Sequence, residues 1–309
     1  MRNRTSAYFL SSLLLAVSSP AGAQETVIVP NVLGPEGPLI VNDDLYYVSW
    51  NPGSLLRWDG KNGKVLNDLK GCSHNGLALT GENTFLVACT DPHGAILEVD
   101  LNGKELRRWD SDDMGGGFDG GVNDIAIAAN GGAYATIFGP FAEKATAIIG
   151  RVIYKAPGSN VWIEVAKDLN YANGIGISPD QKTLYVSEMV GNSIIKFVIE
   201  PDGKLSQKSN FALLNLLLPN KKDGWWSGPD GFKVDKSGNI YVAQFHNGRI
   251  LKISPDGTLI HAFDIAAGDG PTNVAFDKDE KNIYVTVLDK ADDAMGDAKG
   301  KIVKIPNTH

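Results

Sequence analysis

Six polar residues, each with an oxygen-bearing side chain, recur along the chain shortly before a short apolar run. These residues are Glu36, Asn75, Asn123, Asn173, Asp230 and Asn273. If their side chains converge in a desolvated site, the two carboxylates repel each other unless a cation neutralises them. Oxygen-only ligands favour Ca²⁺, with Mg²⁺ or Mn²⁺ as alternatives. Turn chemistry accounts for any one Asn or Asp, but Glu36 is not a turn former.

The polar residues mark an internal repeat, because each stands at the head of a pair of short alternating strands. The spacings between successive heads are 39, 48, 50, 57 and 43 residues. Six copies with this period predict an all-β fold, a six-bladed β-propeller. Two alternatives fit less well, because a β-sandwich pair does not repeat a polar head and β-helix repeats are shorter.

The clearest blade is expected between residues 228 and 260. Its four apolar runs are separated by the turn signals Ser237-Gly238-Asn239, Asn247-Gly248 and Pro255-Asp256-Gly257, which are typical of an up-and-down antiparallel sheet. A propeller must also close its ring. We expect the strand at residues 26–29 to complete the sheet that ends at residues 302–305, so that the N-terminal and C-terminal strands join and no open edge remains.

The first 23 residues have the features of a secretory signal peptide. Arg2 and Arg4 precede an apolar run over residues 8–17, and Ala21-Gly22-Ala23 is a small-residue cleavage site. Residues 24–309 are then a single domain, expected in the periplasm or outside the cell. No other stretch approaches the length of a membrane span. Loss of the two arginines changes the formal net charge from −7 to −9, which argues against a nucleic-acid partner.

Two cysteines flank one predicted hairpin. Cys72 lies nearly opposite Cys89 when the strands pair around Gly81-Glu82-Asn83, and an oxidising compartment would permit a disulfide. The alternative is two buried free thiols.

In a propeller, the innermost strand of each blade starts at one face beside the central channel, so the six heads are expected to form one ring. The second strand returns to the same face and places further side chains at the rim, namely Trp50, Asp91 with His93, Phe138, Glu188, His246 and Asp289. His74 precedes a head and is a further candidate. Trp225 and Trp226 are either core residues between blades or one wall of a pocket. No GxSxG elbow is present, which argues against a serine nucleophile.

Three motif groups resemble one known family. They are Glu36-Gly37-Pro38, then Asn173-Gly174-Ile175 with Ser178-Pro179-Asp180 and Leu184-Tyr185-Val186, and Pro229-Asp230-Gly231 with Gly238-Asn239. Across the whole mature chain, the sequence resembles the senescence marker protein/gluconolactonase (regucalcin-like) propellers, and more distantly paraoxonases and diisopropylfluorophosphatase.

The resemblance implies that Glu36, Asn173 and Asp230 bind one divalent metal, Ca²⁺ first, with Mg²⁺, Mn²⁺ or Zn²⁺ as alternatives. It also implies that Asn123 lies beside metal and substrate. The chain departs from the sugar-lactonase pattern at Gly121, where those members commonly carry an arginine.

These observations lead us to expect a metal-dependent hydrolase of a lactone or related ester, acting on a small molecule. By family analogy Asp230 is the general base, and His246 is the second choice. The expected substrate-binding residues are Asn123, Asn75, Trp50, Phe138, Glu188 and Asn273. Two alternatives stay open: a non-catalytic ligand- or protein-binding propeller with a structural Ca²⁺, and an aryl-ester or organophosphate hydrolase, which the missing arginine favours.

Overall fold

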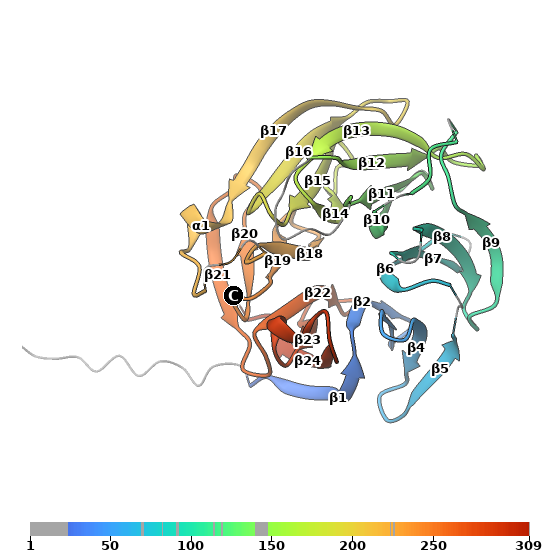
Figure 1. Cartoon of the computed structure of the whole chain (residues 1–309). Coiled ribbons are helices and arrows are strands. Elements are labelled where there is room, and N and C mark those ends of the chain that lie inside the picture. The colour runs from blue at the N-terminus through green and yellow to red at the C-terminus, as the bar shows by residue number, and fades with distance from the viewer. Residues whose placement is uncertain are drawn as a thin grey trace, which may run out of the picture.

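The computed structural model describes residues 24–68, 71–81, 83–90, 93–113, 115–118, 120–139, 148–222, 224 and 226–308. Six four-stranded antiparallel sheets are arranged radially around a central channel (Figure 1). The predicted all-β six-bladed propeller is therefore confirmed. The expected signal peptide (residues 1–23), Asp91 and Trp225 lie outside the described residues.

Each blade runs from the channel outwards in chain order, and the strands of the first three blades have the following bounds. Blade 1 consists of β2 (Pro35–Val41), β3 (Asp44–Ser49), β4 (Ser54–Trp58) and β5 (Gly63–Asn67). Blade 2 consists of β6 (His74–Leu79), β7 (Thr84–Cys89), β8 (Ala95–Asp100) and β9 (Glu105–Trp109). Blade 3 consists of β10 (Val122–Ile127), β11 (Ala133–Ile137), β12 (Gly150–Lys155) and β13 (Ile163–Leu169).

The remaining blades follow the same order, except that the last takes its outer strand from the start of the domain. Blade 4 consists of β14 (Ala172–Ile177), β15 (Thr183–Glu188), β16 (Ser193–Ile199) and β17 (Leu205–Leu213). Blade 5 consists of β18 (Pro229–Val234), β19 (Ile240–Gln244), β20 (Arg249–Ile253) and β21 (Leu259–Asp264). Blade 6 consists of β22 (Gly270–Phe276), β23 (Asn282–Leu288), β24 (Lys299–Pro306) and β1 (Thr26–Leu33).

Strand β1 closes the ring by pairing antiparallel with β24, which places the first and last described strands side by side (Figure 1). The predicted closure is therefore confirmed. On the channel side, the Thr272 hydroxyl of blade 6 donates to the Pro35 carbonyl of blade 1 at 2.8 Å. The last blade is thus joined to the first both at its outer edge and at its centre.

The two helical elements found among the described residues are short. They are α1 (Leu214–Leu217), which follows β17, and the 3₁₀ turn η1 (Ala291–Asp293), which lies between β23 and β24. Within the described part of the chain, no helix has the length and apolar character needed to cross a bilayer.

The blades are held together by apolar side chains packed between neighbouring sheets. A central strand such as β19 contacts sheets on both sides, and all five of its residues are buried. This explains why the inner strands are nearly continuous apolar runs. Between blades 1 and 2, the rings of Tyr46 and Phe85 pack 4.9 Å apart, and such contacts fix the angle at which the blades meet.

A disulfide links Cys72 to Cys89 in blade 2, with the two Cα atoms 4.9 Å apart. Of the two alternatives that the sequence left open for these cysteines, the structure shows the disulfide. The bond ties the start of β6 to the end of β7, at the face where the polar heads lie.

Every innermost strand is irregular at its polar head. The pairing register with the second strand shifts between Glu36 and Leu39, His74 and Leu77, Val122 and Ile125, Ala172 and Ile175, Pro229 and Phe232, and Pro271 and Asn273. The head residues were expected before the strands, but they lie inside them, at β-bulges. A bulge interrupts the ladder and redirects a side chain, which turns each head towards the channel.

Candidate functional site

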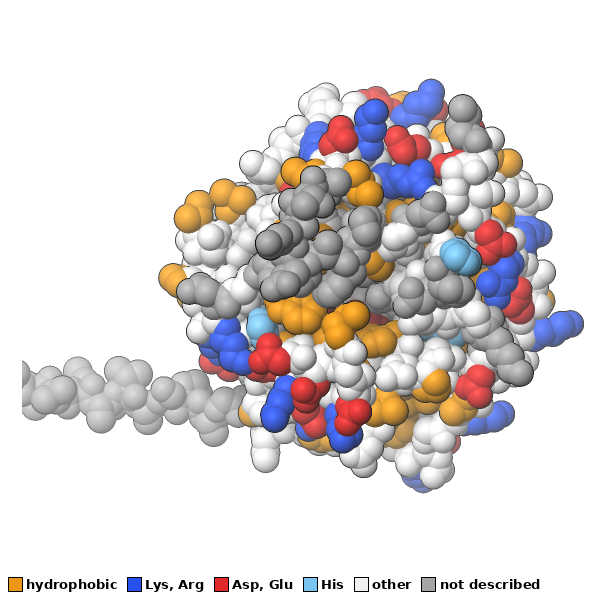
Figure 2. All heavy atoms as spheres, in the orientation of Figure 1, with side chains coloured by type: hydrophobic (Ala, Val, Ile, Leu, Met, Phe, Trp, Pro, Cys, Tyr) orange, Lys and Arg blue, Asp and Glu red, His pale blue; other side chains and the backbone are white. Residues whose placement is uncertain are grey.

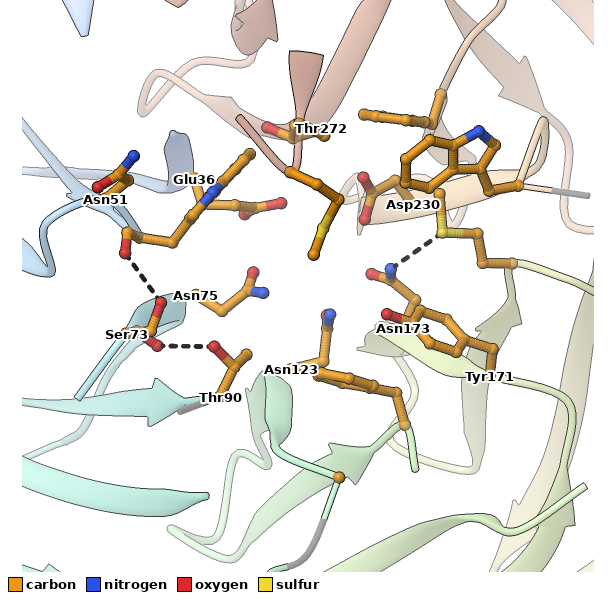
Figure 3. Close-up of a pocket in the computed structure, with 18 of the residues that line it drawn as sticks. Glu36, Asn51, Ser73, Asn75, Thr90, Asn123, Tyr171, Asn173, Asp230 and Thr272 are labelled. Carbon is orange, nitrogen blue, oxygen red and sulfur yellow. Dashed lines mark hydrogen bonds between the residues drawn. The ribbon is translucent and has the colours of Figure 1, made fainter. Parts of the chain in front are cut away.

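A cavity of about 560 Å³ opens at the end of the channel where the polar heads lie. Figure 3 shows the labelled polar side chains encircling one space, with contributions from all six blades. The described residues that line it are Glu36, Trp50, Asn51, Ser73, Asn75, Thr90, Gly120, Asn123, Phe138, Tyr171, Asn173, Met189, Trp226, Asp230, Phe245, Thr272, Ala294, Met295 and Gly296.

The glycines that follow the heads allow the blades to approach closely enough for the ring to form. A Cβ atom on Gly231 would lie 2.2 Å from Cγ of Asn273, the head of the next blade. A Cβ on Gly76 would lie 2.4 Å from Oδ1 of Asp124. Neither position has room for a side chain, so glycine is required there by packing.

Three hydroxyl groups anchor the bulged backbone across the blade boundaries. Besides Thr272, Thr136 donates to the carbonyl of Asn173 at 2.5 Å, and Ser187 donates to the carbonyl of Asp230 at 2.8 Å. Each hydroxyl comes from the blade that precedes the bulge it anchors. The hydrogen bonds satisfy buried carbonyl groups that the disrupted ladder leaves free, and they fix the position of the residues that carry the site.

Glu36 is buried, with 3% of its surface exposed. Its Oε2 atom accepts hydrogen bonds from the backbone N–H of Gly37 at 2.5 Å and from Nδ2 of Asn273 at 3.0 Å. Burial, together with the negative charge of Asp124, raises the pKa of Glu36 from 4.5 to about 8. In the absence of a cation, burial therefore favours the neutral form of this carboxyl group.

Asp230 experiences the same effects. Burial, and then the charge of Glu36, raises its pKa well above the usual value. Burial also raises the pKa of Asp124. Lys233 offsets part of this effect, because its Nζ atom lies 3.9 Å from Asp124 Oδ2. Acidic groups thus accumulate at the centre of the molecule beyond what Lys233 balances.

The donors fit a hard divalent cation. Asn173 is buried, and its Oδ1 atom has no hydrogen-bond partner among the described residues, although its Nδ2 lies 3.7 Å from the sulfur of Met189. An unpaired amide oxygen beside two carboxylates is the ligand chemistry that Ca²⁺ prefers. Within the described residues no group of three His, Cys, Asp or Glu side chains is placed to hold a metal, so an ion here would depend on the amide as well as the acids.

The structure brings seven of the predicted site residues into the cavity wall. These are Glu36, Asn75, Asn123, Asn173, Asp230, Trp50 and Phe138. Trp226 also lines the cavity, so the structure places this tryptophan in a pocket wall. Asn273 lies just behind the lining, where its amide donates to Glu36.

Two other predicted residues, His246 and Glu188, lie behind the described lining. His246 contacts Asp292 Oδ1 through Nε2 at 2.7 Å and Ser227 Oγ through Nδ1 at 3.2 Å. Glu188 accepts hydrogen bonds from the Asn170 backbone N–H and from the Ser193 hydroxyl, both at 2.9 Å. Through these contacts each side chain links neighbouring loops.

The remaining rim candidates also lie outside the described lining. His74 is fully buried, and its Nδ1 lies 2.7 Å from the Cys72 carbonyl. Burial lowers the pKa of His74 to about 4. His93 is exposed, and Asp289 pairs with Lys301 at 2.8 Å.

Sequence reasoning missed much of the cavity wall. The missed residues are Asn51, Ser73, Thr90, Gly120, Tyr171, Met189, Phe245, Thr272, Ala294, Met295 and Gly296. Ser73 and Tyr171 each precede a polar head by two residues, and this spacing was a usable signal. The segment around Met295 gave none, because it reaches the cavity through a loop.

Gly121 lies two residues before the polar head Asn123, and a side chain at this position would have no space. A Cβ there would lie 2.8 Å from the Thr90 carbonyl oxygen and 3.0 Å from Cζ of Phe138. The aromatic ring of Phe138 therefore covers the backbone where a longer side chain would begin.

Comparisons with known proteins agree with this architecture. The curated relatives include the protein named lactonase drp35 from Staphylococcus aureus (strain bovine RF122 / ET3-1), which is 30% identical over 136 residues. That alignment covers 44% of this chain and 39% of the relative, so the matched stretch is less than half of either protein. The protein named lactonase drp35 from Staphylococcus epidermidis is 29% identical over 136 residues, which again cover 44% of this chain and 39% of the relative.

Solved structures match over nearly the whole length and show the shared fold. A protein described as a gluconolactonase from Xanthomonas campestris has a TM-score of 0.74 and 22% identity, covering 92% of this chain and 89% of the other. A protein described as the calcium-binding protein regucalcin from Agrobacterium tumefaciens has a TM-score of 0.70 and 19% identity, covering 92% and 94%. The family model described as SMP-30/Gluconolactonase/LRE-like region matches residues 34–289. The chain therefore belongs to the SMP-30/gluconolactonase/LRE-like family.

Proposed function

We propose that this protein is a divalent-metal-dependent hydrolase that acts on a lactone or a related ester. One observation carries the proposal: two buried carboxyl groups, and an amide oxygen that has no partner among the described residues, face one cavity at the mouth of the propeller. Family membership supports it, as do the relatives named as lactonases and the gluconolactonase with the same fold.

The residues that would hold the cation are Glu36, Asn173 and Asp230, with Ca²⁺ as the first choice. Oxygen donors favour Ca²⁺, Mg²⁺ and Mn²⁺ over softer ions, which leaves Zn²⁺ as the weakest alternative. When bound, such a cation polarises a carbonyl oxygen and lowers the pKa of water at the site.

The protein groups around it have separate roles. Asp230 faces the cavity and is our candidate to accept the proton of the water that attacks the carbonyl carbon. Among the described residues, none forms a side-chain hydrogen bond with Asn75 or Asn123, so both amides can orient the substrate. Trp50 and Phe138 exclude water from one side. His246 stays the second choice for the base, but its ring is engaged by Ser227 and Asp292.

We also propose that the protein functions in the periplasm or outside the cell. The disulfide between Cys72 and Cys89 supports this proposal, because structural disulfides persist in oxidising compartments. The N-terminal sequence, with its charged start and small-residue cleavage site, supports it independently.

The test of the hydrolase is turnover of a lactone and aryl-ester panel by the mature protein, before chelation, after EDTA treatment, and after Ca²⁺ is restored. We expect activity that EDTA removes and Ca²⁺ restores. Asp230→Asn keeps the size of the side chain and should lower kcat/KM by at least about 100-fold, as loss of a general base does.

The matched control is Asp279→Asn, an exposed turn residue paired with Lys281, which should leave activity unchanged. Full activity of Asp230→Asn would overturn its assignment. Bound metal without turnover of any panel member would favour a ligand-binding propeller instead.

A further inference from the structure

The cavity has two chemically different parts. Its floor is the polar ring around Glu36, Asn173 and Asp230. Its walls are apolar and consist mainly of Trp50, Phe138, Tyr171, Met189, Trp226 and Phe245. Figure 2 shows hydrophobic side chains gathered near the centre of this face. A molecule that reaches the floor must therefore lie against aromatic and thioether groups.

The apolar walls are preformed by contacts between side chains. The rings of Phe138 and Tyr171 lie 4.8 Å apart, and those of Trp226 and Phe245 lie 5.9 Å apart. Met295 stands at the mouth with 72% of its surface exposed. Both ring pairs and the exposed Met295 line the same cavity.

Three hydroxyl groups of the described lining are engaged by the backbone. Ser73 donates to the Trp50 carbonyl at 2.8 Å, Thr90 donates to the Ser73 carbonyl at 3.1 Å, and Thr272 donates to Pro35. The single hydrogen of each hydroxyl is therefore committed to the backbone. A substrate rich in hydroxyl groups would leave some of them unpaired against the walls, which costs binding free energy.

The charges of the lining also restrict the substrate. The described lining residues include two carboxyl groups and no lysine, arginine or histidine. An anionic substituent on the substrate would find no cationic side chain to neutralise it. Away from the polar floor, the apolar walls therefore disfavour both hydroxyl-rich and anionic substituents.

We propose that the substrate is an uncharged lactone or ester whose carbonyl group lies on the polar floor and whose alkyl or aryl substituent packs along the apolar walls to Met295. This inference rests on the proposed function, because it assigns the substrate class of the same site. It predicts that affinity increases with the length of the apolar substituent.

The test uses cyclic ketones, which resemble lactones but cannot be hydrolysed. Binding of cyclopentanone, 2-pentylcyclopentanone, 2-heptylcyclopentanone and 1,5-anhydro-D-glucitol to the Ca²⁺-loaded mature protein is measured by calorimetry. We expect the heptyl ketone to bind about tenfold more tightly than the pentyl ketone, since each buried methylene contributes about three- to fourfold. Equal affinities for the ketones, or tighter binding of the anhydroglucitol, would overturn the inference.

Two variants test whether the alkyl substituent of the ketone lies against the proposed walls. Met295→Gln and Trp226→Gln should each reduce the ratio of the heptyl-ketone affinity to the cyclopentanone affinity. The control is Leu216→Gln, at an equally exposed leucine (75%) on α1 that does not line the cavity. An undiminished heptyl advantage in both wall variants would contradict the assignment. Because ketone binding needs no turnover, a failure of hydrolysis on the lactone panel would count against the proposed function and not against this inference.

Discussion

Burial of the Asn173 side chain is energetically unfavourable in the absence of a cation. Its buried Oδ1 atom accepts no hydrogen bond from the described residues, and an unsatisfied buried acceptor costs about 1–3 kcal/mol. Glu36 and Asp230 are also costly, because burial opposes their ionisation. A divalent cation would offset all three costs at once. We therefore interpret these unfavourable features together, as a site preorganised for an ion.

The pH dependence of stability follows from Glu36. In the folded protein Glu36 retains its proton up to about pH 8, whereas in the unfolded chain it loses the proton near pH 4.5. Between these values the unfolded state binds fewer protons, so raising the pH favours unfolding. We expect the melting temperature of the chelated protein to fall from pH 5 to pH 8, and Ca²⁺ to restore it at pH 8.

The matched variant is Glu36→Gln, which cannot ionise and should flatten the pH dependence of the chelated protein. Thermal melts followed by circular dichroism at four pH values would measure it. A chelated wild-type protein that becomes more stable across the same range would contradict the account.

At the scale of elements, the site depends on the bulged inner strands and on the hydroxyl groups that anchor them. Ser187 of β15 is fully buried and donates to the Asp230 carbonyl across the boundary between blades 4 and 5. The bulge directs the Asp230 side chain to the cavity, and the hydroxyl holds its backbone. The position of Asp230 is thus fixed by a residue of the neighbouring blade.

Ser187→Ala should therefore weaken both the fold and the site. Loss of a hydrogen bond to a buried carbonyl should cost about 1–3 kcal/mol in the free energy of unfolding, measured by urea denaturation. Ca²⁺ affinity should fall as well, and Ser187→Thr should recover part of it by keeping the hydroxyl. A Ser187→Ala protein with reduced stability but unchanged Ca²⁺ affinity would show that the hydroxyl supports the fold alone.

The heads illustrate how much of the elements the sequence could predict. The period of the repeat and the residues of the ring were recognisable, and the blades follow them. The bulges were not, because the same Asn, Asp and Gly residues that favour turns also favour interruptions of a strand. Sequence spacing therefore placed the heads before the strands, although β2 starts at Pro35, ahead of Glu36.

The direction of side chains was the second feature that the sequence could not predict. Glu188 ends β15 and His246 follows β19, at the positions expected of rim residues, yet their side chains turn to partners behind the lining. Conversely, Met295 reaches the cavity from the loop after η1, and no periodic pattern places that loop. Local pattern predicts which end of a blade a residue occupies, but loop packing decides what it contacts.

At the scale of the whole molecule, the ring is closed by β1 and β24, and the disulfide reinforces one blade within it. Closure was predictable, because it follows from the absence of free edges. The sequence placed the cysteines opposite each other across one hairpin but left a disulfide and two free thiols as alternatives. The disulfide connects residues 17 apart in sequence, and it flanks Ser73 and Thr90 of the cavity wall.

Replacing both cysteines, Cys72→Ser with Cys89→Ser, should lower the free energy of unfolding by about 3 kcal/mol, the expected effect of a cross-link that closes a loop of this length. Urea denaturation of the double variant and of the reduced wild-type protein would measure the effect. Equal stability of the oxidised and reduced wild-type proteins would show that the bond does not stabilise the blade.

The most direct test of the central claim is a calorimetric Ca²⁺ titration of the chelated mature protein at pH 8, with Asn173→Leu and the exposed-site control Asp279→Asn in parallel. We predict saturable binding to wild type and control and at least about tenfold weaker binding to Asn173→Leu, because the variant removes the unpaired oxygen and keeps the volume. Absence of binding to the wild-type protein, or equal affinity of Asn173→Leu, would contradict a cation site built on the polar ring.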